Sequence, residues 1–330
     1  MSLKARIIGT GSYLPQKVLT NEDLEKLVET SDEWIVSRTG MKERRIAAEG
    51  EHTSQMGYLA AMAALKDADV QADQLDMILV ATITPDFAFP STACLLQAKL
   101  GAVKAAALDI EAACTGYIYA INLARAFIES GLYKTVLIVA SEKLSSIIDY
   151  TDRNTCILFG DGASACVVSS QAKNRNLLIQ EVSLGADGEL ANLLKIPAGS
   201  SHLPASLETV SSRLHYLKME GKEVFKHAVR RMESSSKECL DRLGFIESDI
   251  KWIVPHQANI RIIEAIAKRF NVPMDRVYIT IHKYGNTSAS SVGIALDELI
   301  KEENLCQGDN LLLTAFGAGL TWGSCVLTKE

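Results

Sequence analysis

The chain of 330 residues is 48% hydrophobic and 22% charged, and it carries a formal net charge of −6. These values are typical of a soluble globular protein, and the acidic balance disfavours nucleic acid as a partner. The longest apolar runs, such as residues 77–81 and 136–140, are far too short to span a bilayer, and the N-terminus shows no signal-peptide pattern. We therefore expect a cytoplasmic protein that does not enter a membrane.

The first half of the chain alternates strand and helix patterns, which indicates an α/β layered fold. A strand-like Ile7-Ile8 lies near the start, and Gly101 ends the second of three expected helices. The expected helices lie at 53–68, 91–101 and from Cys114 to about 130, and the expected strands lie at 76–82, 106–110, 135–140 and 163–168.

The second half repeats this order of patterns, which predicts an internal duplication. Between the halves, residues 172–215 have weaker periodicity and more Ser, Pro and Gly, so we expect a connection with a surface excursion there. The predicted halves are residues 1–172 and 173–330. In the second half the expected helices lie at 221–243, 260–270 and 286–300, and the expected strands at 249–255, 277–281, 310–315 and 324–328.

The seven cysteines do not form a disulfide or zinc pattern. Their number is odd, no two are spaced as C-x-x-C, and Cys166 and Cys325 lie inside apolar stretches. Most are therefore interpreted as small buried hydrophobes. No His/Asp/Glu cluster has ligand spacing either, so no metal and no redox cofactor is predicted.

Cys114 is the exception, because it stands where an expected strand passes into a helix. A helix start presents unpaired N–H groups and a partial positive charge, which favour a thiolate over a thiol. This position makes Cys114 a candidate nucleophile.

His256 and Asn286 are the candidate partners of Cys114. In the repeat, Asn286 occupies the place that Cys114 has in the first half, so both are expected at the carboxyl ends of strands, facing one crevice. Taken alone, His256 is more often a structural histidine, and Asn286 is more simply a helix cap before Thr287 and Ser288.

Four separated motifs resemble β-ketoacyl-acyl-carrier-protein synthase III, a family of condensing enzymes, over essentially the whole chain. They are Glu111-Ala-Ala-Cys114-Thr-Gly, His256-Gln-Ala-Asn259, Gly285-Asn-Thr-Ser-Ala-Ser and Phe316-Gly-Ala-Gly-Leu-Thr-Trp-Gly. The resemblance implies a thiolase-like fold in which two duplicated α/β halves form α-β-α-β-α layers. It also implies transfer of a short acyl group, acetyl above all, from coenzyme A to the cysteine, followed by decarboxylative condensation with malonyl-acyl-carrier protein.

The resemblance assigns catalytic roles to Cys114, His256 and Asn286. The backbone N–H groups of Cys114 and of the Gly317-Ala318-Gly319 turn would stabilise the tetrahedral oxyanion. Neutral donors from His256 and Asn286 would stabilise the enolate that decarboxylation produces. Ala318 departs from the family's glycine run, and because alanine resists positive φ, it puts the geometry of that turn in question.

The resemblance also implies residues that hold the substrates, and a homodimer. Phe89 matches a residue that crosses a dimer interface to bound the acyl pocket, and the others match contacts to coenzyme A or phosphopantetheine. These contact positions are Trp34, Arg38, Arg153, Asn259, Arg261 and Phe316.

Two predicted helices carry a basic surface that fits an acidic carrier protein. Spacings of four place three cations on one face of the helix at 221–243, and three more lie on the helix after His256. The alternative is an ordinary solvated face balanced by Glu220, Glu223 and Glu264. The six predicted docking residues are Lys222, Lys226, Arg230, Arg261, Lys268 and Arg269.

Several other functions fit the sequence less well. Gly9-Thr-Gly11 is similar to the start of a dinucleotide-binding loop, but Leu14 occupies the position of the third glycine, so we reject that function. Cys114 and His256 have a papain-like separation, but Cys114 lacks the papain context, so a cysteine hydrolase is a remote alternative. Cys325 is badly placed for the second cysteine of a non-decarboxylating thiolase. A related condensing enzyme of specialised metabolism, with another acyl-CoA primer, is the nearer alternative.

Overall fold

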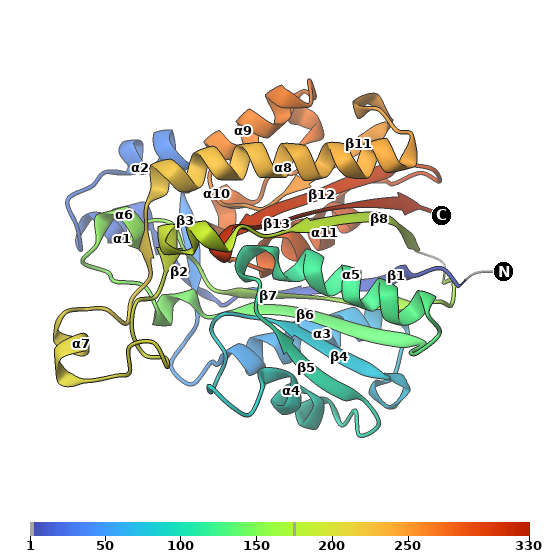
Figure 1. Ribbon diagram of the computed structural model, residues 1–330, viewed down its shortest axis with the longest axis horizontal. Coiled ribbons are helices and arrows are strands. Elements are labelled where there is room, and N and C mark those ends of the chain that lie inside the picture. Colours follow the sequence, from blue (N-terminus) through green and yellow to red (C-terminus); the bar gives the residue numbers. More distant parts are fainter. Residues whose placement is uncertain (1–2, 174–175) are drawn as a thin grey trace.

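A mixed sheet of nine strands runs through the protein in the computed structural model, which describes residues 3–173 and 176–330 (Figure 1). The strand order is β11-β12-β13-β8-β1-β7-β6-β4-β5. The bounds are β1 Arg6–Tyr13, β4 Met77–Ala81, β5 Ala106–Ile110, β6 Thr135–Glu142, β7 Gly162–Ser169, β8 Leu177–Gly185, β11 Ile250–Pro255, β12 Asn310–Gly317 and β13 Thr321–Lys329. Two small sheets pair β2 Lys17–Thr20 with β3 Glu43–Ile46 and β9 Leu194–Lys195 with β10 Lys218–Met219.

The pairing pattern is the same on both sides of the short β1–β8 contact. On one side, β7 is antiparallel to β1 and to β6, and β6 and β4 are parallel. On the other side, β13 is antiparallel to β8 and to β12, and β12 and β11 are parallel. The division at residues 172 and 173 stays a prediction.

The helices lie in three layers around the strands (Figure 1). Helix α3 packs on β1, β6 and β7 from one side, and α8 packs on β8, β12 and β13 from the other. Helices α5 and α11 contact strands of both groups, so they form the middle layer. The bounds are α1 Asn21–Glu25, α2 Asp32–Thr39, α3 Thr53–Ala68, α4 Thr92–Leu100, α5 Gly116–Glu129, α6 Arg153–Cys156, α7 Leu207–Ser211, α8 Gly221–Leu243, α9 Ile260–Arg269, α10 Ile281–Tyr284 and α11 Ser290–Glu302.

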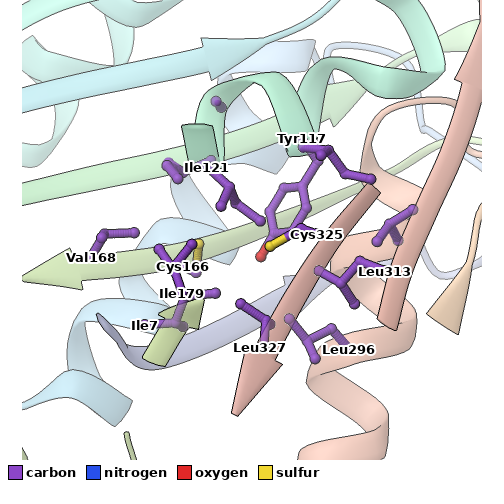
Figure 2. Close-up of a cluster of buried hydrophobic side chains, with 14 of the residues drawn as sticks. Ile7, Tyr117, Ile121, Cys166, Val168, Ile179, Leu296, Leu313, Cys325 and Leu327 are labelled. Atoms are coloured by element: carbon purple, nitrogen blue, oxygen red, sulfur yellow. The ribbon is translucent and has the colours of Figure 1, made fainter. Parts of the chain in front are cut away.

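One apolar core joins the middle helices to strands of both groups. In Figure 2, Tyr117 and Ile121 of α5 and Leu296 of α11 lie among side chains of the surrounding strands. Cys325 and Cys166 are fully buried there. Their placement confirms that they are packing residues, and all seven cysteines of the chain are free. The α-β-α-β-α layering expected from the sequence is confirmed by this arrangement.

Three expected elements are wrong in detail. The segment at 172–215 contains β8, a central strand, because Leu177 to Ile179 are buried between neighbouring strands. Residues 277–281 form no strand beyond one bridge from Val277 to Ile253, because Gln257 takes the hydrogen-bonding groups that a partner strand would need. The helix expected from residue 286 begins at Ser290, after a turn.

Within the described residues, no helix is long and apolar enough to cross a membrane. The same residues contain no group of three His, Cys, Asp or Glu side chains arranged to hold a metal ion.

Candidate active site

Cys114 sits in a strained turn between β5 and α5. Ala113, just before it, has φ of +45°, a left-handed conformation that L-residues with a side chain seldom adopt. Gly116 begins α5 against β4, where a Cβ would lie 2.8 Å from that of Ala81. Thr115 Oγ1 lies 2.7 Å from Thr321 Oγ1, which links the turn to β13. The turn therefore fixes Cys114 at the start of α5, as the sequence predicts.

Burial keeps Cys114 protonated in the resting protein. Desolvation raises the pKa of its thiol to about 12, while interaction with the Ser288 hydroxyl acts in the opposite direction. The expected preference for thiolate at the helix start is thus wrong for the resting site, because the loss of water outweighs it. The reaction must remove this proton.

His256 follows β11 and is held as a neutral imidazole. It is 3% exposed, and desolvation lowers its pKa to about 3. Its Nδ1 lies 2.6 Å from Ser291 Oγ, which also accepts a 3.4 Å bond from the Gln257 N–H. The Ser291 hydroxyl donates to no other group among the described residues, so its proton is available for Nδ1, and we assign the imidazole proton to Nε2.

Asn286 lies in the turn before α11, and a hydrogen bond fixes the orientation of its side-chain amide. Its Oδ1 accepts a 2.8 Å bond from the Ser288 N–H, which leaves Nδ2 as the group available to a ligand. Its backbone exchanges hydrogen bonds with Leu158 O and Gly160 N. The side chain therefore caps its own turn rather than α11, contrary to the simpler sequence interpretation.

The turn after β12 approaches Cys114 closely. A Cβ at Gly317 would lie 2.8 Å from the Cys114 backbone nitrogen, so only glycine fits there. The positive φ angles of this turn belong to Gly319 (+69°) and Leu320 (+43°). Ala318 is not among the described residues with positive φ, so its side chain causes no strain and its N–H is retained.

These groups line one cavity of about 850 Å³. Its deep part holds the buried Cys114, His256 and Asn286. Its walls are largely apolar, and the exposed cations Arg38, Lys222, Lys226 and Arg261 line its outer part. Asn259 and Phe316 line it too, and Asn259 also caps α9 by accepting the Arg261 N–H at 2.9 Å.

Trp34 lines the cavity, and two guanidinium groups lie against its indole. The Arg153 guanidinium carbon is 4.2 Å from the centre of the indole, and that of Arg38 is 5.1 Å from it. Arg153 does not itself line the cavity. The structure thus brings Arg153 of α6, which is distant in the sequence, to Trp34 and Arg38 of α2.

Of the remaining predicted residues, Phe89, Arg230, Lys268 and Arg269 lie outside the cavity. Phe89 is 87% exposed and does not contribute to the cavity of its own chain. Lys226 is paired with Glu223 and Arg269 with Glu233. Among the described residues, Lys222, Arg230, Arg261 and Lys268 form no ion pair, so the basic surface is only partly neutralised.

Sequence reasoning missed several supporting residues. Arg44 is fully buried and donates to Ile157 O and, at 2.7 Å, to Asn21 Oδ1, which fixes the segment that pairs with Asn286. Ser291 holds the imidazole of His256 through Nδ1, and the Gln257 side chain bonds to the neighbouring backbone groups. Glu142 lies at the end of β6, buried near Cys114. No sequence pattern marks Arg44 or Glu142, although Gln257 lies within one of the predicted motifs and Ser291 directly follows another.

Comparison with known proteins gives full-length matches. A family model described as 3-oxoacyl-[acyl-carrier-protein] synthase III matches residues 108–188, and its C-terminal counterpart matches residues 240–329. The beta-ketoacyl-[acyl-carrier-protein] synthase III of Chlamydia pneumoniae is 57% identical over 326 residues, which cover 99% of this chain and 97% of that protein.

Solved structures show the same architecture. The 3-oxoacyl-[acyl-carrier-protein] synthase III of Aquifex aeolicus has a TM-score of 0.90 at 48% identity, covering 98% of this chain and 99% of that one. The priming β-ketosynthase of the R1128 polyketide pathway has a TM-score of 0.90 at 35% identity, covering 99% and 96% of the two chains.

Proposed function

The chain belongs to the 3-oxoacyl-[acyl-carrier-protein] synthase III family, and on that basis we propose how its residues share the family reaction. It is an acyltransferase that condenses a short acyl-CoA with malonyl-acyl-carrier protein and so starts fatty acid synthesis. The observation that supports the residue assignment is that Cys114, His256 and Asn286 are all buried and line the same cavity.

Acyl transfer uses Cys114 as the nucleophile. The thiolate attacks the acyl carbonyl, and coenzyme A leaves as the thiol. The N–H groups of Cys114 and Ala318 stabilise the oxyanion, since the turn at Gly317 brings their two segments into contact. An acyl group bound to Cys114 would lie in the buried part of the cavity.

Condensation uses the two neutral donors. As malonyl-acyl-carrier protein loses carbon dioxide, negative charge develops on its thioester oxygen. Nε2–H of His256 and Nδ2 of Asn286 stabilise that charge without requiring a buried cation. The resulting carbanion then attacks the acyl-cysteine.

The activity is tested by incubating the purified chain with malonyl-acyl-carrier protein and a mixture of acetyl-CoA, branched and longer acyl-CoA. We expect acetoacetyl-acyl-carrier protein as the main product. Preference for a branched or longer primer would keep the reaction and exclude acetyl as the natural primer. A specialised pathway is the weaker alternative, since the polyketide enzyme is 35% identical and the chlamydial synthase 57%.

The outer part of the cavity is proposed to bind coenzyme A through Trp34, Arg38, Arg153, Asn259, Arg261 and Phe316. An adenine that stacks on the indole would replace the present contact with Arg153 or lie beside it.

Trp34→Ala should raise KM for acetyl-CoA about tenfold, the loss expected for one stacked aromatic contact of roughly 1.4 kcal/mol. Initial-rate kinetics with acetyl-CoA and with acetyl-pantetheine separate the effects, since the latter has no adenine and should be unaffected. Equal losses with both substrates would show that Trp34 does not recognise the nucleotide.

The basic residues Lys222, Lys226, Arg230, Arg261, Lys268 and Arg269 are proposed to dock the acidic carrier protein. Lys222, Lys226 and Arg261 line the cavity, so the docking surface surrounds the entrance through which the pantetheine arm would enter. Arg230 and Lys268 are exposed and lie off the cavity, so they report docking alone.

Arg230→Glu and Lys268→Glu should each raise KM for malonyl-acyl-carrier protein while leaving KM for acetyl-CoA unchanged, because they reverse a docking charge outside the cavity. The effect should diminish as salt is added. Lys66→Glu, on the exposed side of α3, is the matched control. A rise in KM for acetyl-CoA, or an equal response of the control, would argue against a specific docking surface.

We further propose a cytoplasmic homodimer that needs no metal or redox cofactor, with Phe89 reaching the acyl pocket of the second subunit. The exposure of Phe89 supports this placement. Sedimentation should give a dimer, and Phe89→Ala should broaden primer choice toward longer acyl-CoA. A monomer with full activity would exclude both the homodimer and the role of Phe89 in the acyl pocket of a second subunit.

A further inference from the structure

Glu142 is a buried carboxyl group close to the catalytic cysteine. It is 0% exposed, and its Oε2 accepts bonds from Thr82 Oγ1 and Ile83 N at 3.1 Å and from Thr84 Oγ1 at 2.7 Å. Its other oxygen, Oε1, is buried and has no hydrogen-bond partner within the described part of the chain. A buried carboxylate normally has donors for both oxygens, so this one needs an explanation.

Ser288 lines the same cavity as Cys114 and as Ile83, whose N–H binds the Glu142 carboxyl group. The Ser288 hydroxyl interacts with the Cys114 thiol and with the Glu142 carboxyl group, and each interaction lowers the pKa of the group it reaches. In the resting structure the hydroxyl makes no well-aligned hydrogen bond within the described residues. Ser288 is 1% exposed, and its φ of +51° is a strained backbone conformation maintained by the Asn286 side chain.

We propose that Ser288 and Glu142 form a proton relay that deprotonates Cys114 for acyl transfer and returns the proton after condensation. Ser288 contacts the reacting thiol and is the catalytic member, and Glu142 acts through it. The inference rests on the proposed role of Cys114 as acyl acceptor.

Each half of the reaction then balances. In acyl transfer, the S–H bond breaks, the thiol proton passes to Ser288 Oγ, and the hydroxyl proton passes to Glu142. The Sγ–C bond forms, the C–S bond to coenzyme A breaks, and the coenzyme A thiolate takes a proton from water. In condensation, the carbanion attack breaks the Sγ–C bond, and the cysteine thiolate regains the proton that Glu142 held. One proton from solution is consumed in each turnover.

The charges in the cavity favour this route over one through His256. Burial raises the pKa of Glu142 to about 7, so its carboxylate is available at neutral pH, whereas His256 resists protonation. The charge of Glu142 opposes formation of a thiolate at Cys114. Transfer of the proton to Glu142 removes that repulsion as the thiolate forms.

The test measures acetylation of Cys114 by acetyl-CoA with rapid quenching and intact-protein mass spectrometry. At pH 7, Ser288→Ala and Glu142→Gln should each slow acetylation about 100-fold, as expected for loss of general base catalysis, and the double variant should be no slower than either. Ser290→Ala is the matched control, since the side chain of this buried serine at the start of α11 bonds only to Thr287 O.

The pH profile separates a relay from a structural role. The wild-type rate should rise through about pH 7 as Glu142 ionises, and that inflection should vanish in Glu142→Gln. Thr82, Ile83, Thr84 and Ser288, the groups that interact with the Glu142 carboxyl group in the described structure, are neutral, and the charge of Glu142 acts on the Cys114 thiol.

Slower variants that keep the inflection, or variants as fast as wild type, would overturn the relay. If Glu142→Gln fails to fold, Ser288→Ala must show the same loss of the inflection, because it interrupts the same route. A wild-type protein that is never acetylated would instead refute the proposed function.

Discussion

Cys114→Ala is expected to form no acyl-enzyme and to lose condensation by at least about 10⁴-fold, the scale set by removal of other catalytic nucleophiles. The buried part of the cavity offers no second thiol in this position. Cys325 and Cys166 are fully buried in the core, away from the lining of the cavity. The measurement is the rate of acetoacetyl-acyl-carrier protein formation, with the mass of the protein recorded after incubation with acetyl-CoA.

Cys94→Ala provides the matched control, because Cys94 is an exposed cysteine on α4. It should acetylate and condense as the wild type does. Condensation that persists in Cys114→Ala at more than a small fraction of the wild-type rate would remove Cys114 from the mechanism.

His256→Ala and Asn286→Ala should retain acetylation of Cys114 but lose about 10²–10³-fold in malonyl decarboxylation, since each removes one donor to the enolate. The two half-reactions are measured separately, by acetylation of the protein and by release of carbon dioxide from labelled malonyl-acyl-carrier protein. Equal loss of both half-reactions would contradict this division of roles.

Asn286→Asp is a sharper version of the same test. Its carboxylate can still accept the Ser288 N–H, so the turn before α11 should be preserved. The same carboxylate would place negative charge against the enolate, so decarboxylation should fall at least as far as in Asn286→Ala. Recovery of decarboxylation in the Asp variant would show that Asn286 serves the turn and not the enolate.

The layered fold could be predicted from the sequence because strand and helix periods alternate clearly in both halves. The prediction of individual strands failed where tertiary contacts decide the backbone conformation against the local sequence pattern. Residues 277–281 have strand composition, but the Gln257 side chain occupies their backbone groups. The strand β8 was missed because its partly buried Glu181, which pairs with Arg125 and Arg242, interrupts the apolar run.

The chemistry of the site was only partly predictable. The sequence gives the order of Cys114, His256 and Asn286, but it does not give their burial. Burial reverses the expected ionisation of Cys114, and it fixes His256 as neutral. The relay through Ser288 and Glu142 depends on three segments that meet only in the folded chain, so no spacing in the sequence reveals it.

The most direct test of the central claim is intact-protein mass spectrometry after incubation with acetyl-CoA, with peptide mapping of the adduct. We predict one acetyl group on Cys114, discharged by malonyl-acyl-carrier protein to give acetoacetyl-acyl-carrier protein. An acetyl group on another residue, or an adduct on Cys114 that malonyl-acyl-carrier protein does not discharge, would contradict it.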